Sequence, residues 1–572
     1  MQVIEGLPVR RAERKELVGL DIEVFGQTEK RLHHPEGTFA CISVAYRGDE
    51  NVYQIYDTAL LPELFDIISA GTWVFHNSIY DLRQLRRWAT IESRLIWDTM
   101  LVEKSLWNGW YDAFGLKDLV RRYLGIHMNK ETREHFMHWT GMDDAMKEYA
   151  ALDSYYTVRV AERQARLQPE HDLSNYFKVD APMIWVALDM LKVKVDVKGW
   201  ETLIETFDPK AKELEADLGV NVMAFAKVKE MLNVMYGYQV ESTGEAVLME
   251  AIGALTEDGS DIDMTDMSTH AVIKKILLAR TYRTAVSRYG KKWLAEHVDS
   301  HGMVLSDWKA SEAKTGRMSS SNPGLQQIPS RKLPEYRELF ISARGVLVGV
   351  DISQQEPRIT ACESGDKELW DAFLNGIDVH LKVARMVTRD MEMVKEDPRR
   401  NKLGKPLNLG LVYGLTAHGI SNRTGMPLLE AEKLLAMYFQ SFKGVKKWID
   451  YEHNFGLKNE FVTTAAKRRC WLNLHDYKWA NNAINSPIQG GGADFTKRWM
   501  YHVWKAFRGL GKPFPIVLIV HDEALADVPE EDAELTKQIM LEAMGRAGEE
   551  LYPGMPFKGD PGIGKTWREV HH

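Results

Sequence analysis

Four acidic residues in the N-terminal part of this 572-residue chain are candidates for a metal site. Asp21 and Glu23 stand two apart in the apolar segment 17–25, so on a β-strand both side chains point to the same face. Asp81 and Asp153 come from two other segments. Four carboxylates converging from three segments would repel one another unless cations lay among them. Oxygen ligands of this kind suit Mg²⁺ or Mn²⁺.

An aromatic hydroxyl accompanies the last of these carboxylates. Tyr149 and Asp153 are four residues apart, which places them on one face of a helix. Two metal ions, with a tyrosine that orients water, are suited to the hydrolysis of a phosphodiester. Taken singly, an Asp-x-Glu at a strand edge and a Tyr-x-x-x-Asp on a helix are usually surface features. Their order and spacing along the chain favour the catalytic interpretation.

A second set of acidic residues follows apolar segments in the C-terminal two-thirds. Asp351 lies near the C-terminal end of the segment GVLVGVDI, and Asp522 and Glu523 interrupt the apolar segment 515–528, whose pattern predicts a β-hairpin. Charged groups in such a place are costly unless they are paired or metal-bound. Two aspartates on adjacent strands can hold two Mg²⁺ ions beside a triphosphate. The alternative for Asp351 alone is a turn residue at a strand end.

A basic stretch lies between these two acidic segments. Residues 381–405 hold eight Lys or Arg and four Asp or Glu, a net +4 in a protein of net charge −8. Lys405, Leu409 and Tyr413 are four residues apart in turn, so they share one face of a helix. They could meet a phosphate, a sugar and a base respectively. The alternative is a solvated helix face. Pro406 indicates that this helix begins at Lys405.

The elements that must position these groups change in type along the chain. Strand-like and helix-like segments alternate up to about residue 165, which indicates an α/β layered sheet. Helical periodicity dominates residues 173–300, and strand-like segments return at 345–352 and 515–528. This change of pattern places a domain boundary near residues 165–175.

Residues 15–165 resemble the DEDD-type 3′→5′ proofreading exonucleases, in their tyrosine-containing branch. The three motifs of that family are matched by Asp21-Ile-Glu23, by the segment from Asn77 to Asp81, and by the segment from Tyr149 to Asp153. The resemblance implies that the four carboxylates bind metal, that Tyr149 is catalytic and that Asn77 contacts DNA.

The rest of the chain, about residues 173–572, resembles the family A (DNA polymerase I type) DNA polymerases, and the layout is similar to that of short phage polymerases. The matching segments occur in the family's order: Thr315 to Ser320, Leu325 to Arg331, Asp351 to Arg358, Asp378 to His380, Lys405 to Gly414, Asn485 to Gly490, and His521 to Glu523.

The combined resemblance implies a ribonuclease H-like α/β exonuclease domain (1–170) followed by an α+β right-hand polymerase domain (171–572). Within the polymerase domain we expect a thumb at about 173–310, a palm at about 311–365 and 451–572, and fingers at about 366–450.

The resemblance also implies roles for individual residues of the polymerase domain. Asp351 and Asp522 would hold the metals, with Glu523 supporting them. Nucleotide-binding residues would be Gln354, Glu356, His380, Lys405, Leu409 and Tyr413, with Glu356 excluding a 2′-hydroxyl. DNA-binding residues would be Arg317, Gln326, Arg331, Asn485, Gln489 and His521.

Several positions depart from the family pattern, and two of them concern the nucleotide site. Asn401 stands where the family usually has arginine, and either Arg400 or Lys402 could substitute for it. Leu409 stands where phenylalanine or tyrosine is commoner. Leucine has no hydroxyl, so we expect discrimination against dideoxynucleotides.

One further motif matches a known pattern without its context. The segment from Gly559 to Thr566 satisfies the G-x-x-x-x-G-K-[ST] pattern of a phosphate-binding loop, with Lys565 as its lysine. Such a loop must follow a strand and open a helix. Only six residues follow Thr566, which leaves no room for that helix, so we expect neither a helix nor a nucleotide site there.

Composition limits the remaining possibilities. Apolar residues make up 45% and charged residues 27% of the chain, and the three cysteines are too few for a disulfide framework. No apolar run reaches the ~18 residues of a membrane span, so we expect no membrane partner and a cytoplasmic location, in a bacterial host if the chain is phage-encoded.

The expected partners are a primed DNA template and deoxynucleoside triphosphates, with two Mg²⁺ (or Mn²⁺) ions per active site. A processivity factor, a helicase or a single-strand binding protein are further candidates. The alternatives are a repair or lesion-bypass polymerase, and a DNA-binding accessory protein with decayed sites.

Overall fold

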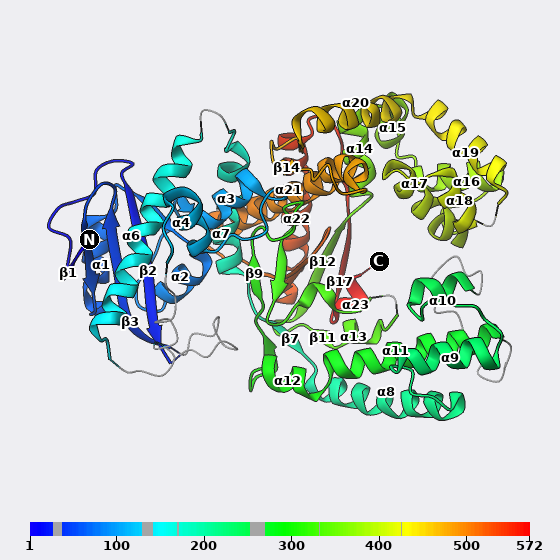
Figure 1. Cartoon of the computed structure of the whole chain (residues 1–572), viewed down its shortest axis with the longest axis horizontal. Coiled ribbons are helices and arrows are strands. Elements are labelled where there is room, and N and C mark those ends of the chain that lie inside the picture. The colour runs from blue at the N-terminus through cyan, green and yellow to red at the C-terminus, as the bar shows by residue number, and fades with distance from the viewer. Residues whose placement is uncertain are drawn as a thin grey trace.

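The computed structural model of the chain describes residues 1–26, 37–128, 136, 141–168, 171–251, 269–330, 332–424 and 426–571. Figure 1 shows the N-terminal α/β unit at the left, a central sheet, and two helical arms at the right that face each other. Among the described helices, none is both long and apolar enough to cross a membrane.

A six-stranded mixed sheet forms the N-terminal unit, in the order β1-β4-β3-β2-β5-β6. Its inner strands consist largely of buried apolar residues, which explains why they were recognisable from the sequence. β2, β3 and β4 are antiparallel, whereas β5 and β6 continue the sheet in parallel. The strands are β1 (Gln2–Glu5), β2 (Leu17–Phe25), β3 (Thr38–Tyr46), β4 (Asn51–Ile55), β5 (Thr72–Phe75) and β6 (Ile96–Asp98).

Helix α6 (Asp144–Arg166) lies across β2 and β3 of this sheet. Gly19 on β2 permits this close approach, because a Cβ there would lie 2.5 Å from the carbonyl oxygen of Ser154. Asp98 caps the N-terminus of α3 by accepting from two backbone amides. The other helices of the unit are α1 (Leu61–Ile67), α2 (Ser78–Leu85), α3 (Thr99–Trp107) and α4 (Leu116–Leu124).

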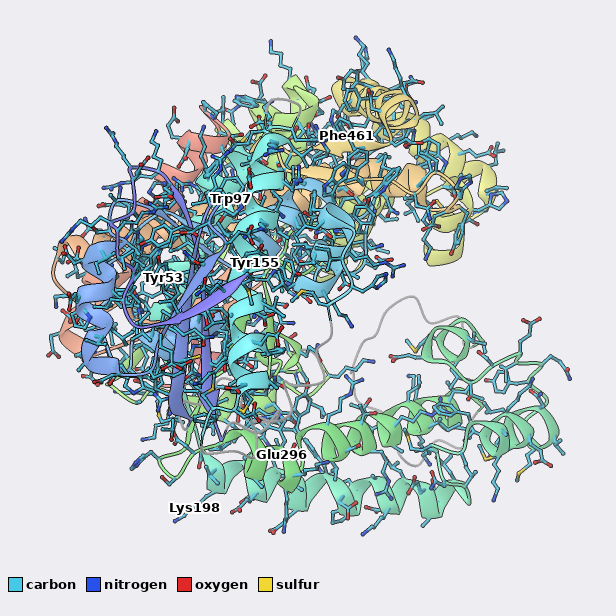
Figure 2. All side chains as sticks on the ribbon, turned by 60° about the vertical axis from the view of Figure 1, so that its left-hand side comes forward. Tyr53, Trp97, Tyr155, Lys198, Glu296 and Phe461 are labelled. Atoms are coloured by element: carbon cyan, nitrogen blue, oxygen red, sulfur yellow. The ribbon has the colours of Figure 1, made fainter. Side chains whose placement is uncertain are left out.

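The lower arm consists mainly of two long packed helices, α8 (Val197–Leu218) and α11 (Thr269–Tyr289). Its tip has a small apolar core of its own. In the turned view of Figure 2 the arm extends away from the body, with Lys198 and Glu296 near its base. Its remaining helices are α9 (Phe225–Met235), α10 (Glu245–Ala251) and α12 (Lys291–His297).

A four-stranded antiparallel sheet forms the centre, in the order β15-β16-β12-β17. β15 (Ile516–Val520) and β16 (Glu523–Val528) form the predicted hairpin, and both are fully buried. β12 (Val346–Ile352) is the predicted strand that ends beside Asp351, and β17 (Gly559–Gly564) forms the sheet edge. The helices α21 (Trp479–Gly509) and α22 (Ala533–Leu551) pack together beside this sheet.

The upper arm is helical throughout its described part. α17 begins at Lys405, as Pro406 predicted, and a π-helical segment (Arg400–Gly404) precedes it. The helix ends at Val412, so Tyr413 lies just beyond it; the prediction that Tyr413 shares this helix was wrong by one residue. The helices are α14 (Gln355–Ser364), α15 (Lys367–Leu374), α16 (Val379–Thr388), α17 (Lys405–Val412), α18 (Ala417–Thr424), α19 (Leu428–Ser441) and α20 (Lys443–Asn459).

Short elements join the large units. Two hairpins lie between the N-terminal unit and the central sheet: β9 (Asp307–Lys309) with β10 (Ser319–Ser321), and β13 (Phe461–Thr463) with β14 (Arg469–Trp471). The remaining elements are α7 (Ala181–Asp189), β7 (Val193–Val195), β8 (Met303–Val304), α13 (Glu335–Glu338), β11 (Phe340–Ile341) and α23 (Trp567–Val570).

Candidate active sites

Three carboxylates of the N-terminal unit meet at one point. Asp21 and Glu23 come from β2 and Asp153 from α6, and one oxygen of each lies within 4.8 Å of the others. The alternation of β2 puts the first two on the face that α6 covers. Hard oxygen donors at this spacing fit a divalent cation such as Mg²⁺ or Mn²⁺.

The fourth predicted carboxylate lies beside this cluster. Asp81, in the first turn of α2, accepts a hydrogen bond from the backbone amide of Ile22 at 3.2 Å. Burial, followed by repulsion from Asp21, raises the pKa of Asp81 well above its usual range. A cation would relieve this repulsion, so the donor set as a whole fits bound metal.

Two other predicted residues of this unit flank the cluster. Asn77 has a left-handed backbone (φ 65°) at the turn from β5 into α2. Its backbone amide donates to the Asp98 Oδ1 at 3.2 Å. Tyr149 is buried on α6, one turn before Asp153, and its ring lies 5.9 Å from that of Phe136. All five exonuclease-type residues and Asn77 therefore lie in neighbouring elements around one end of β2.

The second acidic pair lies in the central sheet. Asp351 is at the end of β12, and the turn between β15 and β16 carries Asp522, whose carbonyl oxygen accepts from the amide of Ile352 at 3.0 Å. Burial, followed by repulsion from Asp522, raises the pKa of Asp351 to about 8. Burial also raises the pKa of Asp522. Two buried carboxylates disfavour each other's ionised form, and a divalent cation between them would relieve this repulsion.

Glu523 is directly opposite Asp351 in the sheet and is engaged by the protein itself. Its carboxylate accepts from the Trp567 indole Nε1 at 2.9 Å and from the Arg337 Nη1 at 3.4 Å. The His571 Nδ1 lies 3.3 Å from the same carboxylate. These partners fix Glu523 to α13 and to the C-terminal segment around α23, connections that no local sequence pattern indicates.

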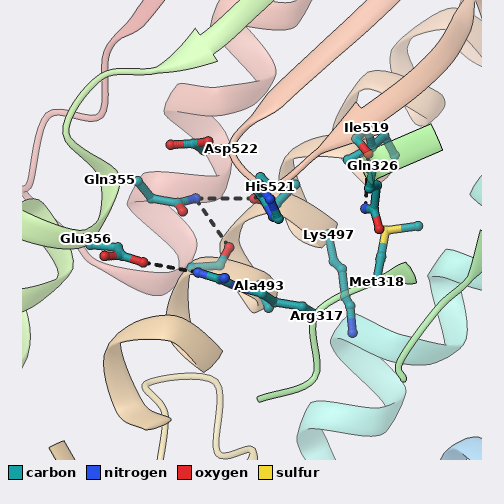
Figure 3. Close-up of a pocket in the computed structure, with 12 residues that line it drawn as sticks. Arg317, Met318, Gln326, Gln355, Glu356, Ala493, Lys497, Ile519, His521 and Asp522 are labelled. Atoms are coloured by element: carbon teal, nitrogen blue, oxygen red, sulfur yellow. Dashed lines mark hydrogen bonds and ion pairs between the residues drawn. The ribbon is translucent and has the colours of Figure 1, made fainter. Parts of the chain in front are cut away.

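A cavity of about 270 Å³ opens beside Asp522. Figure 3 shows Asp522, His521 and Glu356 on one side of it and Lys497 and Met318 on another. Residues of five segments meet here: the β9–β10 loop, the turn at Gln326, the start of α14, the middle of α21, and the end of β15 with the turn that follows it. The charged and polar residues that line it are Arg317, Gln326, Gln355, Glu356, Thr496, Lys497, His521 and Asp522.

Glu356 is held from two sides in this cavity. The Arg317 Nη2 donates to the Glu356 Oε1 at 3.1 Å, and the Tyr413 hydroxyl donates to the other oxygen. Burial, followed by the negative charge of Glu356, raises the pKa of Tyr413 far above its usual range, so the phenol stays protonated. Gln354, the N-cap residue of α14, has a left-handed backbone and a buried Oε1 without a hydrogen-bond partner.

The residues that we expect to contact the triphosphate lie on the upper arm. His380 on α16 is buried, and its Nδ1 lies 3.2 Å from the Asn408 amide nitrogen. Burial, with the positive charges of Arg400 and Lys405 nearby, lowers the pKa of His380 to about 4, so the imidazole is neutral at pH 7. Lys405 is exposed at the start of α17. Arg400 forms an ion pair with Asp378 at 2.6 Å.

Besides Arg317, four predicted DNA-binding residues lie on or near the cavity wall. Asn485 and Gln489 are one turn apart on α21, and the Asn485 Oδ1 is buried without a hydrogen-bond partner. Gln326 donates to the Ile519 carbonyl oxygen at 3.1 Å. His521 has a left-handed backbone, and burial lowers the pKa of its imidazole. Arg331 and the side chains of Lys402 and Leu409 lie outside the described residues.

Sequence reasoning missed a buried charge network beneath this site. Arg468 donates to Asp180 at 2.8 Å and to Asp494 at 2.7 Å, and the Lys497 Nζ donates to Asp180 at 2.6 Å. All four side chains are at most 2% exposed. The network joins α21 to the β13–β14 hairpin and to the segment before α7. Its members are far apart in sequence and belong to no recognised motif, so no local signal could have found them.

The loop-like motif near the C-terminus is a strand. Residues 559–564 form β17, paired along its length with β12. The Lys565 Nζ donates to the Gly345 carbonyl oxygen at 2.8 Å and forms an ion pair with Glu530. The helix that follows, α23, has a single turn (Trp567–Val570). The expectation that no helix could form there was wrong, but a paired edge strand cannot wrap around a phosphate.

Comparisons with known proteins agree with this geometry. Residues 205–569 match the model of DNA polymerase family A, and residues 9–167 match that of a 3′-5′ exonuclease. The chain is 28% identical over 525 residues to DNA polymerase I of Chloroflexus aurantiacus, covering 86% of this chain and 54% of that protein. It is 26% identical over 593 residues to DNA polymerase I of Aquifex aeolicus, covering 98% of each.

A solved structure has the same fold. It is the POL domain of Pol1 from M. smegmatis, in complex with DNA primer-template and dNTP, with a TM-score of 0.80 at 24% identity over 97% of this chain and 96% of that one. The chain spans about half the length of the Chloroflexus relative and nearly all of the Aquifex relative. The predicted order of an exonuclease fold followed by a polymerase fold is thereby confirmed. This chain belongs to DNA polymerase family A and carries a 3′-5′ exonuclease domain ahead of its polymerase domain.

Proposed function

We propose that this family A polymerase extends a DNA primer on a template and removes misincorporated nucleotides from the 3′ end. The observation that supports this best is the presence of two separate carboxylate sites. One comprises Asp21, Glu23 and Asp153 in the exonuclease unit, and the other comprises Asp351 and Asp522 at the central sheet. A polymerase without proofreading would need only the second.

We further propose two Mg²⁺ or Mn²⁺ ions at each site. Asp351 and Asp522 would hold them in the polymerase, and Asp21, Glu23, Asp81 and Asp153 in the exonuclease. Such ions lower the pKa of an attacking hydroxyl or water and neutralise charge on the leaving group. Glu523 would keep the floor of the polymerase site rigid through Trp567 and Arg337. Tyr149 would orient the attacking water in the exonuclease.

The incoming nucleotide would lie against the start of α14 and α17. Glu356, fixed by Arg317 and Tyr413, would occupy the space that a ribose 2′-hydroxyl needs. Lys405 would supply positive charge to the triphosphate. His380 would act as a neutral hydrogen-bond donor, because its buried imidazole carries no charge at pH 7. We place Gln354 and Leu409 beside the nucleotide as well.

DNA would enter between the two arms. Side chains on the cavity wall would contact the minor groove near the primer terminus, where correct base pairs present similar acceptors. These contacts would therefore test the shape of the pair rather than its sequence. We assign minor-groove contact to Arg317, Gln326, Asn485, Gln489 and His521, and also to Arg331, which lies outside the described residues. Asn77 would contact the exonuclease-bound strand.

Other assignments follow from the same proposal. We divide the chain into an exonuclease domain (1–170) and a polymerase domain (171–572), with thumb, palm and fingers near 173–310, 311–365 with 451–572, and 366–450. Replication of a phage genome in a bacterial cytoplasm is the setting we propose, with a processivity factor, helicase or single-strand binding protein as partners.

Separate inactivation of the two sites tests the proposal. With Mg²⁺ and a primed template, Asp153→Ala should abolish primer degradation and leave extension, whereas Asp351→Ala should abolish extension and leave degradation. Mass spectrometry of the products identifies each activity. If either folded variant lost both activities, or the unmodified protein had neither, the two-site proposal would be wrong.

A further inference from the structure

The loop between β9 and β10 bears Arg317 and is bound by the exonuclease domain. The Lys104 Nζ, on α3, donates to the Ser311 carbonyl oxygen at 2.9 Å. The Asn108 Nδ2, one residue past that helix, donates to the Ala313 carbonyl oxygen at 2.8 Å. Lys104 is 6% and Asn108 5% exposed, so both contacts are shielded from water.

Asn108 acts at the turn that determines the path of Arg317. The Ala313 carbonyl oxygen also accepts from the Gly316 amide at 2.8 Å, which closes the turn. The amides of Glu312 and Ala313 in turn donate to the Arg317 carbonyl oxygen at 3.2 and 3.4 Å. The Asn108 side chain is therefore connected to the Arg317 backbone through Ala313 by two successive hydrogen bonds.

The far side of this loop is equally constrained. Gly316 has a φ of +76°, and a Cβ there would overlap the buried guanidinium of Arg468. The base of the hairpin is held by Arg83 on α2, whose Nη1 lies 3.4 Å from the Asp307 Oδ1. The exonuclease helices α2 and α3 thus hold this hairpin at both its base and its loop.

The end of α3 is itself fixed against the polymerase domain. Trp107 stacks on Trp471 of β14, with ring centroids 5.3 Å apart and an interplanar angle of 18°. The Trp471 indole Nε1 donates to the Leu106 carbonyl oxygen at 2.7 Å, and the Trp471 amide donates to that of Asn108 at 3.3 Å. Asn108 is therefore a rigid anchor rather than a mobile surface group.

We propose that Asn108 and Lys104 of the exonuclease domain are positioning residues for Arg317, so that selection of a correctly paired primer terminus by the polymerase site depends on its neighbouring domain. The inference rests on the proposed function. Neither residue contacts the cavity; each acts through the loop. Arginine has many rotamers, and a contact that discriminates pair shape requires its backbone to be fixed.

The test uses an exonuclease-silent parent, Asp153→Ala, so that degradation does not obscure extension. Asn108→Ala and Lys104→Met are made in it, with Lys104→Arg as the variant that retains the donor. The matched control is Asp112→Ala, which removes an exposed ion pair to Lys314 in the same loop. Single-nucleotide incorporation is measured on primers with matched and mismatched 3′ termini, together with kcat, KM and thermal unfolding.

We expect matched extension to fall about five- to tenfold in kcat for Asn108→Ala and Lys104→Met, which is typical for loss of a buried hydrogen bond. The kcat for extension of mismatched primers should change less than twofold, so the ratio of matched to mismatched extension falls. Lys104→Arg and Asp112→Ala should retain the ratio of the parent. Degradation of single-stranded DNA by Asn108→Ala with Asp153 intact should stay within twofold of wild type.

The inference would be overturned if the ratio of matched to mismatched extension rates were unchanged in both variants. This includes the case in which the rates on both primers fall by the same factor. If Asn108→Ala lowers the Tm so far that it does not fold, Lys104→Met alone decides. Failure of the parent to extend any primer would instead disprove the proposed function, so the two failures are distinguishable.

Discussion

Arg317 donates from its Nη2 to the Glu356 Oε1 at 3.1 Å, joining the β9–β10 loop to the first turn of α14. Both side chains are partly exposed, so the pair contributes little to stability. Its importance is geometric, because it links the residue we place at the primer terminus to the residue we place against the sugar. A disturbance of either group therefore reaches the other.

Replacement of Glu356 tests the sugar-selection role. Glu356→Ala removes the group that Arg317 and Tyr413 hold in place. We expect incorporation of ribonucleotides relative to deoxynucleotides to rise roughly tenfold or more, because Glu356 would clash with the 2′-hydroxyl and leave it buried without a hydrogen-bond partner. The overall rate should fall. Steady-state incorporation of each triphosphate opposite one template base measures the ratio, and Glu356→Gln, of similar size, should retain most of the selectivity. An unchanged ratio in Glu356→Ala would remove the residue from this role.

A buried acidic pair predicts pH-dependent stability. Burial, followed for Glu363 by the charge of Glu452, raises the pKa of both carboxyls to about 7. Between pH 4.5 and 7 the folded chain retains protons that the unfolded chain has lost, so stability falls as the pH rises through this window. Glu363→Gln should flatten that dependence and raise the Tm at pH 8.

Calorimetry from pH 5 to 8 measures this effect. The matched control is Glu432→Gln, an exposed substitution on α19 that should leave the profile unchanged. A profile for Glu363→Gln as steep as that of the wild type would contradict the assignment.

The buried network around Arg468 predicts a large loss of stability. Arg468→Met would leave Asp180 and Asp494 as buried charges without their guanidinium partner. Breaking one partner of a buried pair costs about 3–5 kcal/mol in the free energy of unfolding. Lys467→Met, at the exposed neighbouring position, is the control and should cost little. Denaturant unfolding compares the two, and equal midpoints would show that the network adds no stability.

The loop-like motif near the C-terminus predicts a negative result. Lys565 is paired with Glu530 and the Gly345 carbonyl oxygen on the outer edge of the central sheet. Lys565→Ala should therefore leave the KM for deoxynucleoside triphosphates within twofold of wild type. Because the ion pair is exposed, the free energy of unfolding should change little. A large rise in KM would show that this edge does bind nucleotide.

Local patterns predicted the elements that carry the sites. The apolar runs ending near Glu23 and Asp351 are strands, and the segment around Asp522 is a hairpin, because period and burial are encoded locally. Convergence of Asp21 and Asp153 followed from a resemblance and not from periodicity alone. The roles of these side chains remain predictions.

The features that the sequence did not predict depend on contacts between distant segments. Tyr413 lies beyond its helix because α17 ends at Val412, which Pro406 and the apolar pattern did not reveal. Trp567 and His571 reach Glu523 only through the fold of the C-terminal segment. The anchoring of Ala313 by Asn108 likewise joins residues some two hundred positions apart, for which one sequence contains no signal.

The pairing of β12 with β16 and β17 has a consequence for biosynthesis. Every strand of the exonuclease sheet lies between residues 2 and 98, whereas β12 finds its two neighbours only at 523–528 and 559–564. A chain leaving the ribosome can therefore complete the exonuclease sheet long before the central sheet, and distant pairings of this kind form slowly. During translation the sheet that carries Asp21 and Glu23 therefore forms before the sheet that carries Asp351, so on the proposed function a nascent chain acquires its degrading site ahead of its synthesising site.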